Sequence, residues 1–324
     1  MTAPPVPDLA DVLAARQRIA PYLRPTPLYR YPALDAMVGA RLWVKHENHQ
    51  PIGAFKVRGG VNLVSQLTGD QRRRGVIAAS TGNHGQSVAY AAAAFGVRAV
   101  ICVPERANPV KVESMRALGA EVVMHGRDFD EAREHCEKLA AEHRYRYIHS
   151  GNEPALIAGV ATYTLEMLET RPDIEAIVVP VGGGSGAAGA CVVAGAVRPS
   201  IEVIGVQSEA APAAFRSWRA RALVGDTMGT FAEGLATRTA FELPQRILQE
   251  LLDDFVLVSE EALKTATRVM IEKTRNLVEP AGAAALAAVL AAPSRFAGRQ
   301  VAIVCSGGNI SPAQLVDLWP RESA

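Results

Sequence analysis

Short apolar runs alternate with helical patterns at a regular spacing from Gly75 onward. In chain order they fall at residues 76–79 (strand), 84–95 (helix), 97–103 (strand), 110–118 (helix), 121–124 (strand), 128–142 (helix) and 145–148 (strand). Strands that alternate with helices of this length form parallel βαβ units, in which helices cover both faces of one sheet. The sequence therefore predicts an α/β protein with a small doubly wound domain at 71–150.

A second alternation follows, with a different rhythm. It predicts helices at 154–169, 186–197 and 280–292 and strands at 174–179, 203–207 and 301–305, while residues 208–255 show mixed helix and loop patterns. A helix at 8–24 and a strand at 42–44 precede the small domain. We expect residues 1–70 and 151–324 to form one larger domain.

Composition limits the partners of this chain. The formal net charge of +1 gives no electrostatic attraction to nucleic acid or to a membrane surface. The four cysteines have no paired spacing for zinc, and three lie in apolar runs, as reduced thiols of a cytosolic protein do. We expect no secretory signal, because prolines interrupt the first 24 residues. The uncharged stretch 176–197 is long enough to span a bilayer, but Pro180 and the glycines after it indicate a strand, a loop and a helix.

Lys56 lies where a helix is expected to begin, just after the turn that Pro51 and Gly53 mark. The positive end of the helix dipole disfavours a charged amine there, and the apolar neighbours Phe55 and Val57 could bury it. Burial lowers the pKa of a lysine, and a neutral lysine amine forms Schiff bases with carbonyl compounds. Taken alone, this position is equally compatible with a lysine that extends its ammonium to solvent.

Three polar turns that contain glycine follow predicted strands, where ligands gather in open α/β sheets. The first, Ser80-Thr81-Gly82-Asn83-His84, could hold a carboxylate at a helix N-terminus, or its side chains could simply cap that helix. The second, Gly182-Gly183-Gly184-Ser185-Gly186, presents a cup of backbone N–H groups that suits a phosphate. The third, Ser306-Gly307-Gly308-Asn309, places a hydroxyl at a strand end, with an ordinary turn as the alternative.

The second turn also matches the dinucleotide fingerprint, as Gly184-x-Gly186-x-x-Gly189, with Glu209 one strand further on. An NAD-dependent oxidoreductase is therefore a hypothesis from another class of function. It gives no role to Lys56 or to the first and third turns. Pyridoxal 5'-phosphate gives each a role, because it requires an amine for its aldehyde, a cup for its phosphate and a partner for its ring nitrogen.

Taken together, these motifs resemble the fold-type-II pyridoxal-phosphate enzymes, specifically the threonine/serine dehydratase and serine racemase family. The resemblance covers nearly the whole chain, through Pro25-Thr26-Pro27-Leu28, Gly53-x-Phe55-Lys56-x-Arg58-Gly59, Ser80 to Gln86, Arg116 to Ala120, Glu153-Pro154 with Ala158-Gly159, Gly182 to Gly186, Glu279-Pro280-Ala281-Gly282 and Ser306 to Asn309. It implies a tryptophan synthase β-like fold, with two doubly wound parallel-sheet domains and the active site between them.

The resemblance also implies roles for individual residues. Lys56 would carry the cofactor and then act as the base on the substrate Cα. Phe55 would pack near the cofactor ring, Asn83 would bond its phenolic oxygen, Gly182, Gly183, Gly184, Ser185 and Gly186 would hold its phosphate, and Ser306 would bond its ring nitrogen. Ser80, Thr81, Gly82 and His84 would surround the substrate carboxylate. The expected reaction is a β-elimination on L-threonine, L-serine or a related 3-hydroxy amino acid, which gives a 2-oxo acid and ammonia.

Some positions depart from the family pattern. Thr81 stands where racemases of the family use a serine, and its extra methyl restricts its rotamers, so serine racemase activity is expected only as a side activity. Gln207 and Ala213 stand where the family's divalent-metal site has acidic residues, so no metal is expected. Gly151 stands where familiar threonine dehydratases carry a bulky aromatic residue. Substrates larger than threonine, such as phenylserine or hydroxyectoine-derived acids, are therefore an alternative, unless Gly151 only supports a turn.

The resemblance finally bears on assembly. Family members are often dimers or tetramers, so we expect a homo-oligomer. The chain ends soon after Asn309. We therefore expect no counterpart of the regulatory domain of feedback-inhibited biosynthetic threonine dehydratases.

Overall fold

The computed structural model describes residues 4–319, and contacts divide the chain into two compact units. Unit 1 comprises 1–24 and 56–162, and unit 2 comprises 25–55 and 163–324, so the chain enters unit 1 between Phe55 and Lys56. This division groups 4–24, 56–70 and 151–162 with the doubly wound block, whereas the sequence predicted that they belong to the larger domain. The functional domain boundaries remain a prediction, and their outermost parts, 1–3 and 320–324, lie outside the described residues.

Unit 1 is built on a four-stranded sheet in the order β5-β4-β3-β6. Its strands are β3 (Val76–Ala79), β4 (Ala99–Val103), β5 (Glu121–Met124) and β6 (Arg146–Tyr147). All three pairings are parallel, which confirms the predicted doubly wound arrangement. The helices of this unit are α1 (Leu9–Ile19), α3 (Lys56–Ser65), α4 (Gly69–Arg74), α5 (Asn83–Ala94), α6 (Pro109–Ala117), α7 (Phe129–His143) and the first part of α8 (Pro154–Thr170).

The central strands β3 and β4 of unit 1 are buried on both faces, because helices cover each side, whereas the edge strands β5 and β6 are at most partly buried. Ile77 and Cys102 pack with Cys136 of α7 in one cluster. Ile101, the neighbour of Cys102 in β4, contacts the opposite layer, where a Cβ built on Gly85 of α5 would lie 3.1 Å from its Cγ2. Successive side chains of a strand point to opposite faces, so a parallel sheet between two helical layers gives a continuous apolar run rather than an alternating one.

Unit 2 contains a six-stranded sheet in the order β1-β2-β10-β7-β8-β9. Its strands are β1 (Leu28–Arg30), β2 (Arg41–His46), β7 (Ala176–Pro180), β8 (Glu202–Ser208), β9 (Asp254–Val258) and β10 (Gln300–Cys305). The sheet is parallel except for the edge strand β1, which pairs antiparallel with β2. The main core of this unit gathers alternate residues of these strands against α13 (Pro280–Ala291).

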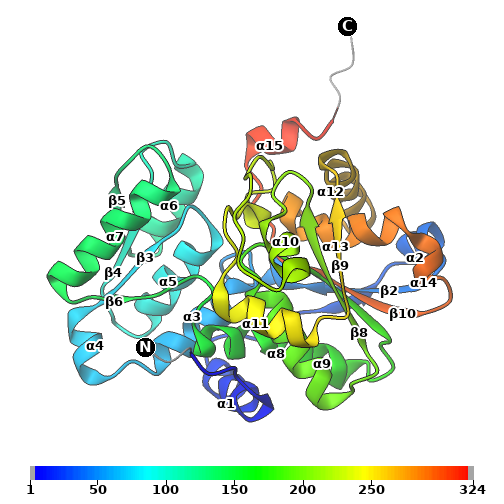
Figure 1. Ribbon diagram of the computed structural model, residues 1–324, viewed down its shortest axis with the longest axis horizontal. Helices are drawn as coiled ribbons and strands as arrows, with labels where there is room; N and C mark the ends of the chain where they lie inside the picture. Colours follow the sequence, from blue (N-terminus) through cyan, green and yellow to red (C-terminus); the bar gives the residue numbers. More distant parts are fainter. Residues whose placement is uncertain (1–3, 320–324) are drawn as a thin grey trace, which may run out of the picture. The chain divides into compact units, whose positions relative to one another are not determined.

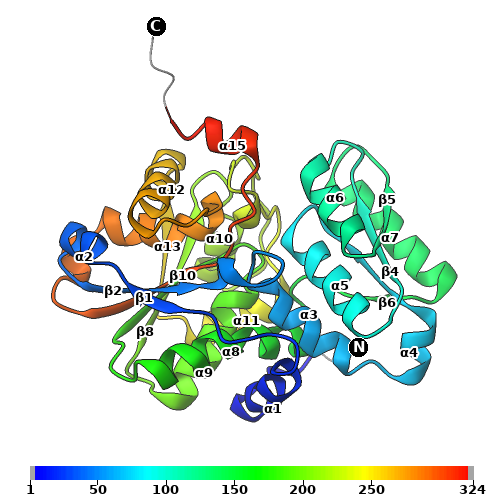
Figure 2. The same cartoon turned by 180° about the vertical axis from the view of Figure 1, so that it is seen from behind.

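Helices lie on both faces of the larger sheet (Figures 1 and 2). The alanine-rich α13 contacts four of its strands from one side, while α9 (Ser185–Val197) covers the other side together with α11 (Glu242–Leu251). The remaining elements are α2 (Pro32–Val38), α10 (Ala213–Ala220), α12 (Glu260–Thr274), α14 (Pro293–Phe296), α15 (Pro312–Val316) and the short 3-10 turns 47–49 and 233–235. The strand, glycine loop and helix predicted for 176–197 are present as β7, the turn and α9. Within 4–319, no helix has the length and apolarity to cross a membrane.

Candidate active site

Lys56 opens α3, as predicted, with no acidic residue in the first turn to offset its charge. Its side chain is partly buried, and its Nζ donates a hydrogen bond to the Ser150 carbonyl at 3.0 Å. Burial lowers the pKa of Lys56 from 10.5 to about 8, because removal from water disfavours the charged form. At neutral pH this amine is thus far easier to deprotonate than an exposed lysine.

The residues before Lys56 are fixed to the third predicted turn. The Phe55 N–H donates to the Ser306 carbonyl at 3.0 Å, the Gly308 N–H to the Gly53 carbonyl at 2.8 Å, and the Asn309 side-chain amide to Ile52 at 2.8 Å. Gly53 has a left-handed φ of +67°, and a Cβ there would lie 2.8 Å from Oδ1 of Asn309. The turn after β10 therefore sets the position of the chain just ahead of the lysine.

A buried polar network that the sequence analysis did not identify lies behind this segment. The Thr26 hydroxyl donates to Glu47 at 2.5 Å, and the Lys45 ammonium contacts the Thr26 carbonyl at 2.8 Å and the Glu166 carboxylate at 2.5 Å. Lys45 and Glu47 are 1% and 0% exposed, and such charges are tolerated inside a protein only when they are paired or hydrogen-bonded. The network explains the Pro25-Thr26-Pro27 motif, because its threonine is the hydrogen-bonding centre. The available signal was a pair of charged residues at the end of an apolar strand, Lys45 inside β2 and Glu47 just after it.

The turn Ser80–His84 joins β3 to α5. The Ser80 hydroxyl accepts the N–H groups of Gly82 at 3.2 Å and Gly85 at 2.9 Å, so the capping role considered from the sequence is present. This cap does not involve the N–H groups of Asn83 and His84. Ser80 is 7% exposed, whereas Thr81 and Gly82 are more accessible. The turn thus combines its own cap with an accessible rim at a helix N-terminus, a place that suits an anion.

Two neutral imidazoles accompany Lys56 within unit 1. Nε2–H of His84 donates to the Ile148 carbonyl at 3.1 Å, which leaves Nδ1 as a buried acceptor without a partner. Nδ1 of His149 accepts the N–H groups of Gly151 and Asn152 at 3.0 and 2.9 Å. Burial, reinforced by the Lys56 charge, lowers the pKa of His84 to about 3 and that of His149 to about 4. The His84 ring can therefore accept a hydrogen bond at Nδ1 but cannot donate one there to a carboxylate.

The glycine cup at 182–186 joins β7 to α9. Gly184, at φ +86°, is the N-cap, and no side chain caps the helix. A Cβ on Gly182 would lie 2.2 Å from the Gly234 carbonyl, and one on Gly183 would lie 2.2 Å from the Phe241 ring. The consecutive glycines are therefore required by close approach of the protein's own chain. Backbone N–H groups at a helix N-terminus of this kind suit a phosphate.

Phe55 lies in the same unit as this cup. Its ring meets that of Tyr163 edge to face, with centroids 6.2 Å apart, and the Tyr163 hydroxyl donates to the Gly186 carbonyl at 2.8 Å. A Cβ on Gly186 would lie 3.4 Å from the Phe55 ring. Phe55 therefore packs beside the start of α9.

Two further family motifs have packing roles. A Cβ on Gly159 of α8 would lie 2.6 Å from the Arg58 carbonyl of α3, so Ala158-Gly159 allows the two helices to meet. A Cβ on Gly282 would lie 2.4 Å from the Gly307 carbonyl, so Pro280-Ala281-Gly282 places α13 directly against the Ser306 turn. Both motifs support the segments on either side of Lys56.

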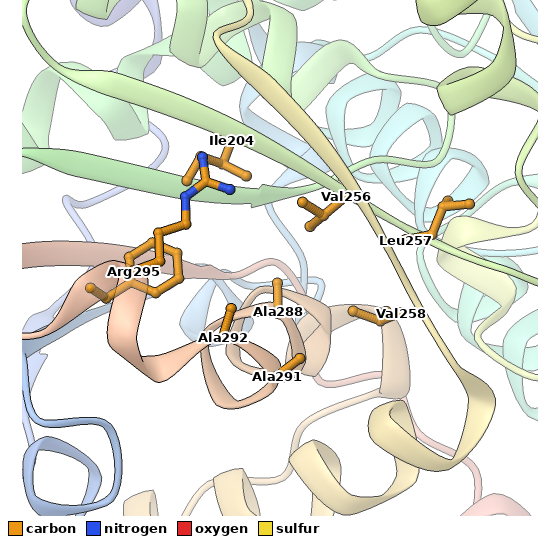
Figure 3. Close-up of a pocket in the computed structure, with 9 residues that line it drawn as sticks. Ile204, Val256, Leu257, Val258, Ala288, Ala291, Ala292 and Arg295 are labelled. Atoms are coloured by element: carbon orange, nitrogen blue, oxygen red, sulfur yellow. The ribbon is translucent and has the colours of Figure 1, made fainter.

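Unit 2 also contains a small cavity, and none of the site residues described above lines it (Figure 3). It has a volume of about 90 Å³ and is lined by apolar side chains of β8, β9, α13 and α14 and by Arg295, which pairs with Glu202 and Asp254. Ligand pockets for small molecules usually measure about 300–1,000 Å³, so this cavity is a packing feature. The described residues contain no cluster of three or more histidines, cysteines and acids, and Gln207 is bonded to Phe215 N–H and to Thr237.

The chain matches known proteins over most of its length. Residues 19–307 match the family of pyridoxal-phosphate dependent enzymes. An L-threonine ammonia-lyase of Thermotoga maritima is 38% identical over 93% of this chain and 75% of its own length, and a biosynthetic L-threonine dehydratase of Pasteurella multocida is 36% identical over 88% and 56%. The solved structure of maize serine racemase superposes with a TM-score of 0.91 at 31% identity, covering 97% of both chains. These matches confirm the predicted fold-type-II architecture and favour it over the dinucleotide hypothesis. The chain therefore belongs to the pyridoxal-phosphate dependent enzyme family.

Proposed function

We propose that this enzyme, a pyridoxal-phosphate-dependent lyase, removes the β-hydroxyl of L-threonine or L-serine and releases a 2-oxo acid and ammonia. The observation that carries the proposal is Lys56, a partly buried amine with its pKa lowered to about 8 at the first turn of α3. The ammonia-lyase and dehydratase relatives support the reaction class, and the L-threonine in their names supports threonine as the substrate. Because the chain spans 56% of the biosynthetic relative, the activity of that longer protein is not carried over whole.

The residues of both units fit the cofactor. Lys56 supplies an amine of low pKa, and the 13-residue helix α9 begins at a glycine cup without a side-chain cap. When bound, pyridoxal phosphate joins covalently to a lysine and draws electrons from the substrate Cα. In this proposal Lys56 is that lysine, Gly182 to Gly186 hold the phosphate, Phe55 packs near the ring, Asn83 bonds the phenolic oxygen and Ser306 bonds the ring nitrogen.

Lys56 also acts as the base in this proposal. Its neutral amine takes the proton from the substrate Cα, and the carbonyl of Ser150, 3.0 Å away, accepts a hydrogen bond and orients the amine. Cleavage of the Cα–H and Cβ–O bonds forms a carbon–carbon double bond and water. The released enamine hydrolyses to the 2-oxo acid and ammonia.

The Ser80–His84 turn is the proposed carboxylate site. The helix N-terminus and the turn backbone supply the donors there, and Ser80 shapes the turn through the N–H groups of Gly82 and Gly85. His84 was predicted to contact the substrate carboxylate. In this proposal only its backbone N–H does so, because Nδ1 of its side chain carries a lone pair and cannot donate a hydrogen bond to a carboxylate. That acceptor suits an N–H or O–H group of the substrate instead.

Serine racemase activity is the second candidate, as a side activity. Racemisation needs an acid on the opposite face of the cofactor ring. The similarity to maize serine racemase supports this second activity as a candidate. The Ser80 hydroxyl already accepts two backbone N–H groups, which leaves Thr81 as the proposed acid. Measuring D-serine formed from L-serine, with Thr81→Ser as the improved variant and Thr81→Ala as the control, tests this role.

A wider substrate pocket is a related proposal. Gly151 is buried beside Ser150, the residue that binds Lys56, and it carries no side chain to form a wall. The backbone N–H of Gly151 donates a hydrogen bond to Nδ1 of His149, which supports the simpler view that this glycine only maintains the turn. Threonine therefore remains the main substrate, with phenylserine and hydroxyectoine-derived acids as larger alternatives.

The proposal also covers the assembly and the cellular location of the protein. We infer a homo-oligomer, dimer or tetramer, from the family resemblance, and light scattering tests it. A cytoplasmic location is supported by four cysteines that are all free and buried, Cys102, Cys136, Cys191 and Cys305.

The decisive experiment combines chemistry with a substrate panel. Borohydride reduction of the loaded enzyme should attach the cofactor to the peptide that contains Lys56, and Lys56→Ala should abolish both attachment and turnover. Serine, threonine and phenylserine are then assayed for 2-oxo acid and ammonia. Attachment at another lysine, or formation of neither product from any of the three substrates, would contradict the proposal. The NAD hypothesis predicts instead a rise in Tm with NAD.

A further inference from the structure

Lys111 lies against the Ser80–His84 turn, and the sequence analysis gave it no role. It is the third residue of α6 and is 6% exposed. A Cβ built on Gly82 would lie 3.8 Å from its Nζ and 3.8 Å from its Cδ. Helices α5 and α6 contact each other along the same side of the unit 1 sheet (Figure 2). The ammonium therefore lies beside the middle residue of the turn.

This position is unfavourable for a lysine on two grounds. The first turn of a helix carries the positive end of the dipole, and α6 has no acidic residue there. Lysine is also among the residue types least often buried. The helix start does not depend on the Lys111 side chain, because the Asn108 side chain accepts the Val110 N–H at 3.0 Å and Pro109 occupies the first helical position. A side chain that opposes both local preferences is expected where function requires it.

The proposed carboxylate site needs a positive charge. A carboxylate moved from water into a partly enclosed turn loses solvation that backbone N–H groups only partly replace. The imidazole of His84 cannot provide the charge, since burial lowers its pKa to about 3. The amine of Lys56 is assigned to the cofactor. Lys111 is the cation that the structure places at the turn itself.

We propose that Lys111 is a substrate-binding residue, whose ammonium stabilises the substrate carboxylate at the Ser80–His84 turn and restricts the enzyme to ligands with a free carboxylate. This inference rests on the proposed function of that turn. Backbone N–H groups can bond the oxygen of either a carboxylate or an amide. A neighbouring ammonium distinguishes the two, because only the carboxylate is charged.

The test measures binding of two small probes to the pyridoxal-phosphate-loaded enzyme by calorimetry. Propanoate carries the charge, and propanamide is its neutral counterpart. Lys111→Met should raise the Kd of propanoate about tenfold, the loss of one charge-assisted contact, and leave that of propanamide unchanged. Lys111→Arg should stay within about threefold of wild type, since it keeps the charge. Lys138→Met removes an exposed lysine of α7 from the same unit and should change nothing.

Kinetics with threonine separate binding from a structural role. Lys111→Met should raise KM with kcat nearly unchanged, because the carboxylate contact exists before and during the reaction. If Lys111→Met does not fold, as judged by its Tm, Lys111→Gln carries the same test. A folded neutral variant that binds propanoate as wild type does would overturn the proposal. Absence of 2-oxo acid from the wild-type enzyme would instead contradict the proposed reaction, whatever the propanoate result.

Discussion

The Ser80–His84 turn of unit 1 and the Gly182–Gly186 turn of unit 2 both follow a parallel strand of their own sheet, but different residue types determine their conformations. Each links the carboxyl end of a parallel strand to the N-terminus of a helix. The first is capped by its own serine hydroxyl and is flanked by a histidine and a lysine. The second has no side-chain cap, and its glycines are pressed against other parts of the chain. One turn is shaped by side chains and the other by their absence.

This difference suggests how each turn can vary. A turn that depends on side chains can change its ligand by substitution while the backbone remains the same. A turn that depends on glycine has no such freedom, because each added atom meets a neighbour. In the proposed function the first turn binds the substrate, which varies across a family, and the second binds the phosphate of a constant cofactor.

The largest expected effect comes from adding one methyl group to the second turn. In Gly183→Ala the new Cβ would lie 2.2 Å from the Phe241 ring, so the turn or the ring must move. We expect a loss of unfolding free energy of about 1–3 kcal/mol and a lower cofactor content, measured by urea unfolding and absorbance. Gly195→Ala, in the helix α9 that follows the turn, is the control, because no heavy atom lies within 4 Å of the new Cβ; it should be neutral or stabilising. If both variants had the same unfolding free energy and cofactor content, close contacts would not explain the glycines of the second turn.

The second prediction concerns pH and Lys56. The amine must be neutral to attack an aldehyde, so its reaction rate with pyridoxal phosphate in the cofactor-free protein should rise with pH and level off above about 8. A lysine in a short unstructured peptide should still gain reactivity up to about pH 10.4. Borohydride trapping and peptide mapping follow Lys56, and the peptide is measured in parallel. A Lys56 profile that coincides with that of the peptide would show that burial does not shift its pKa.

The same pKa shift predicts a change in stability. The folded pKa of Lys56 is lowered to about 8, whereas the unfolded value is 10.5. Between these pH values the unfolded chain binds more protons than the folded one, so this residue makes the free energy of unfolding rise as the pH rises. Lys56→Met should remove that component of the pH dependence in the cofactor-free protein.

The third prediction restores a wall near the substrate. Gly151→Phe should lower kcat/KM for phenylserine at least tenfold while threonine changes less, because each methylene that can no longer be buried forfeits about 0.8 kcal/mol. Gly151→Ala is the control, since it alters the turn without filling the space. An equal loss for both substrates would indicate that glycine only maintains the turn through its bond to His149.

The sequence predicted most strands of the two sheets and the glycine-containing turns, but it did not show every contact that requires a glycine in those turns. Continuous apolar runs located β3, β4, β7, β8 and β10, because parallel strands buried on both faces leave an unambiguous signal. A short apolar run also located β5, although that edge strand is only partly buried. The strand β9 was missed, since only Phe255 and Val258 of its five residues are buried and its first residues lie in the stretch 208–255, whose pattern is mixed. The edge strand β1 has three residues, too few to show any period.

The candidate site shows the same limit. Motifs identified Lys56 and the three turns, since glycine and lysine stand out at those positions. They could not show that Gly183 is required by Phe241, a residue far away in the sequence, because that contact exists only in the fold. Lys111 was missed for the same reason, although a lysine in the first turn of a helix without acidic residues was a usable signal. The tautomer of His84 likewise depends on the Ile148 carbonyl.

The smallest expected effect concerns the turn after β10. Ser306 is 7% exposed, and its carbonyl, which a substitution does not remove, holds the Phe55 N–H. Ser306→Ala should therefore keep the fold and the position of Phe55, and lose only the hydroxyl proposed to bond the cofactor ring nitrogen. A neutral hydrogen bond contributes about 0.5–1.5 kcal/mol, so the Kd for pyridoxal phosphate should rise roughly two- to twelvefold. Ser306→Cys keeps the shape with a weaker donor and should lie between. If cofactor binding and turnover in Ser306→Ala equal those of wild type, the Ser306 hydroxyl has no role at the ring nitrogen.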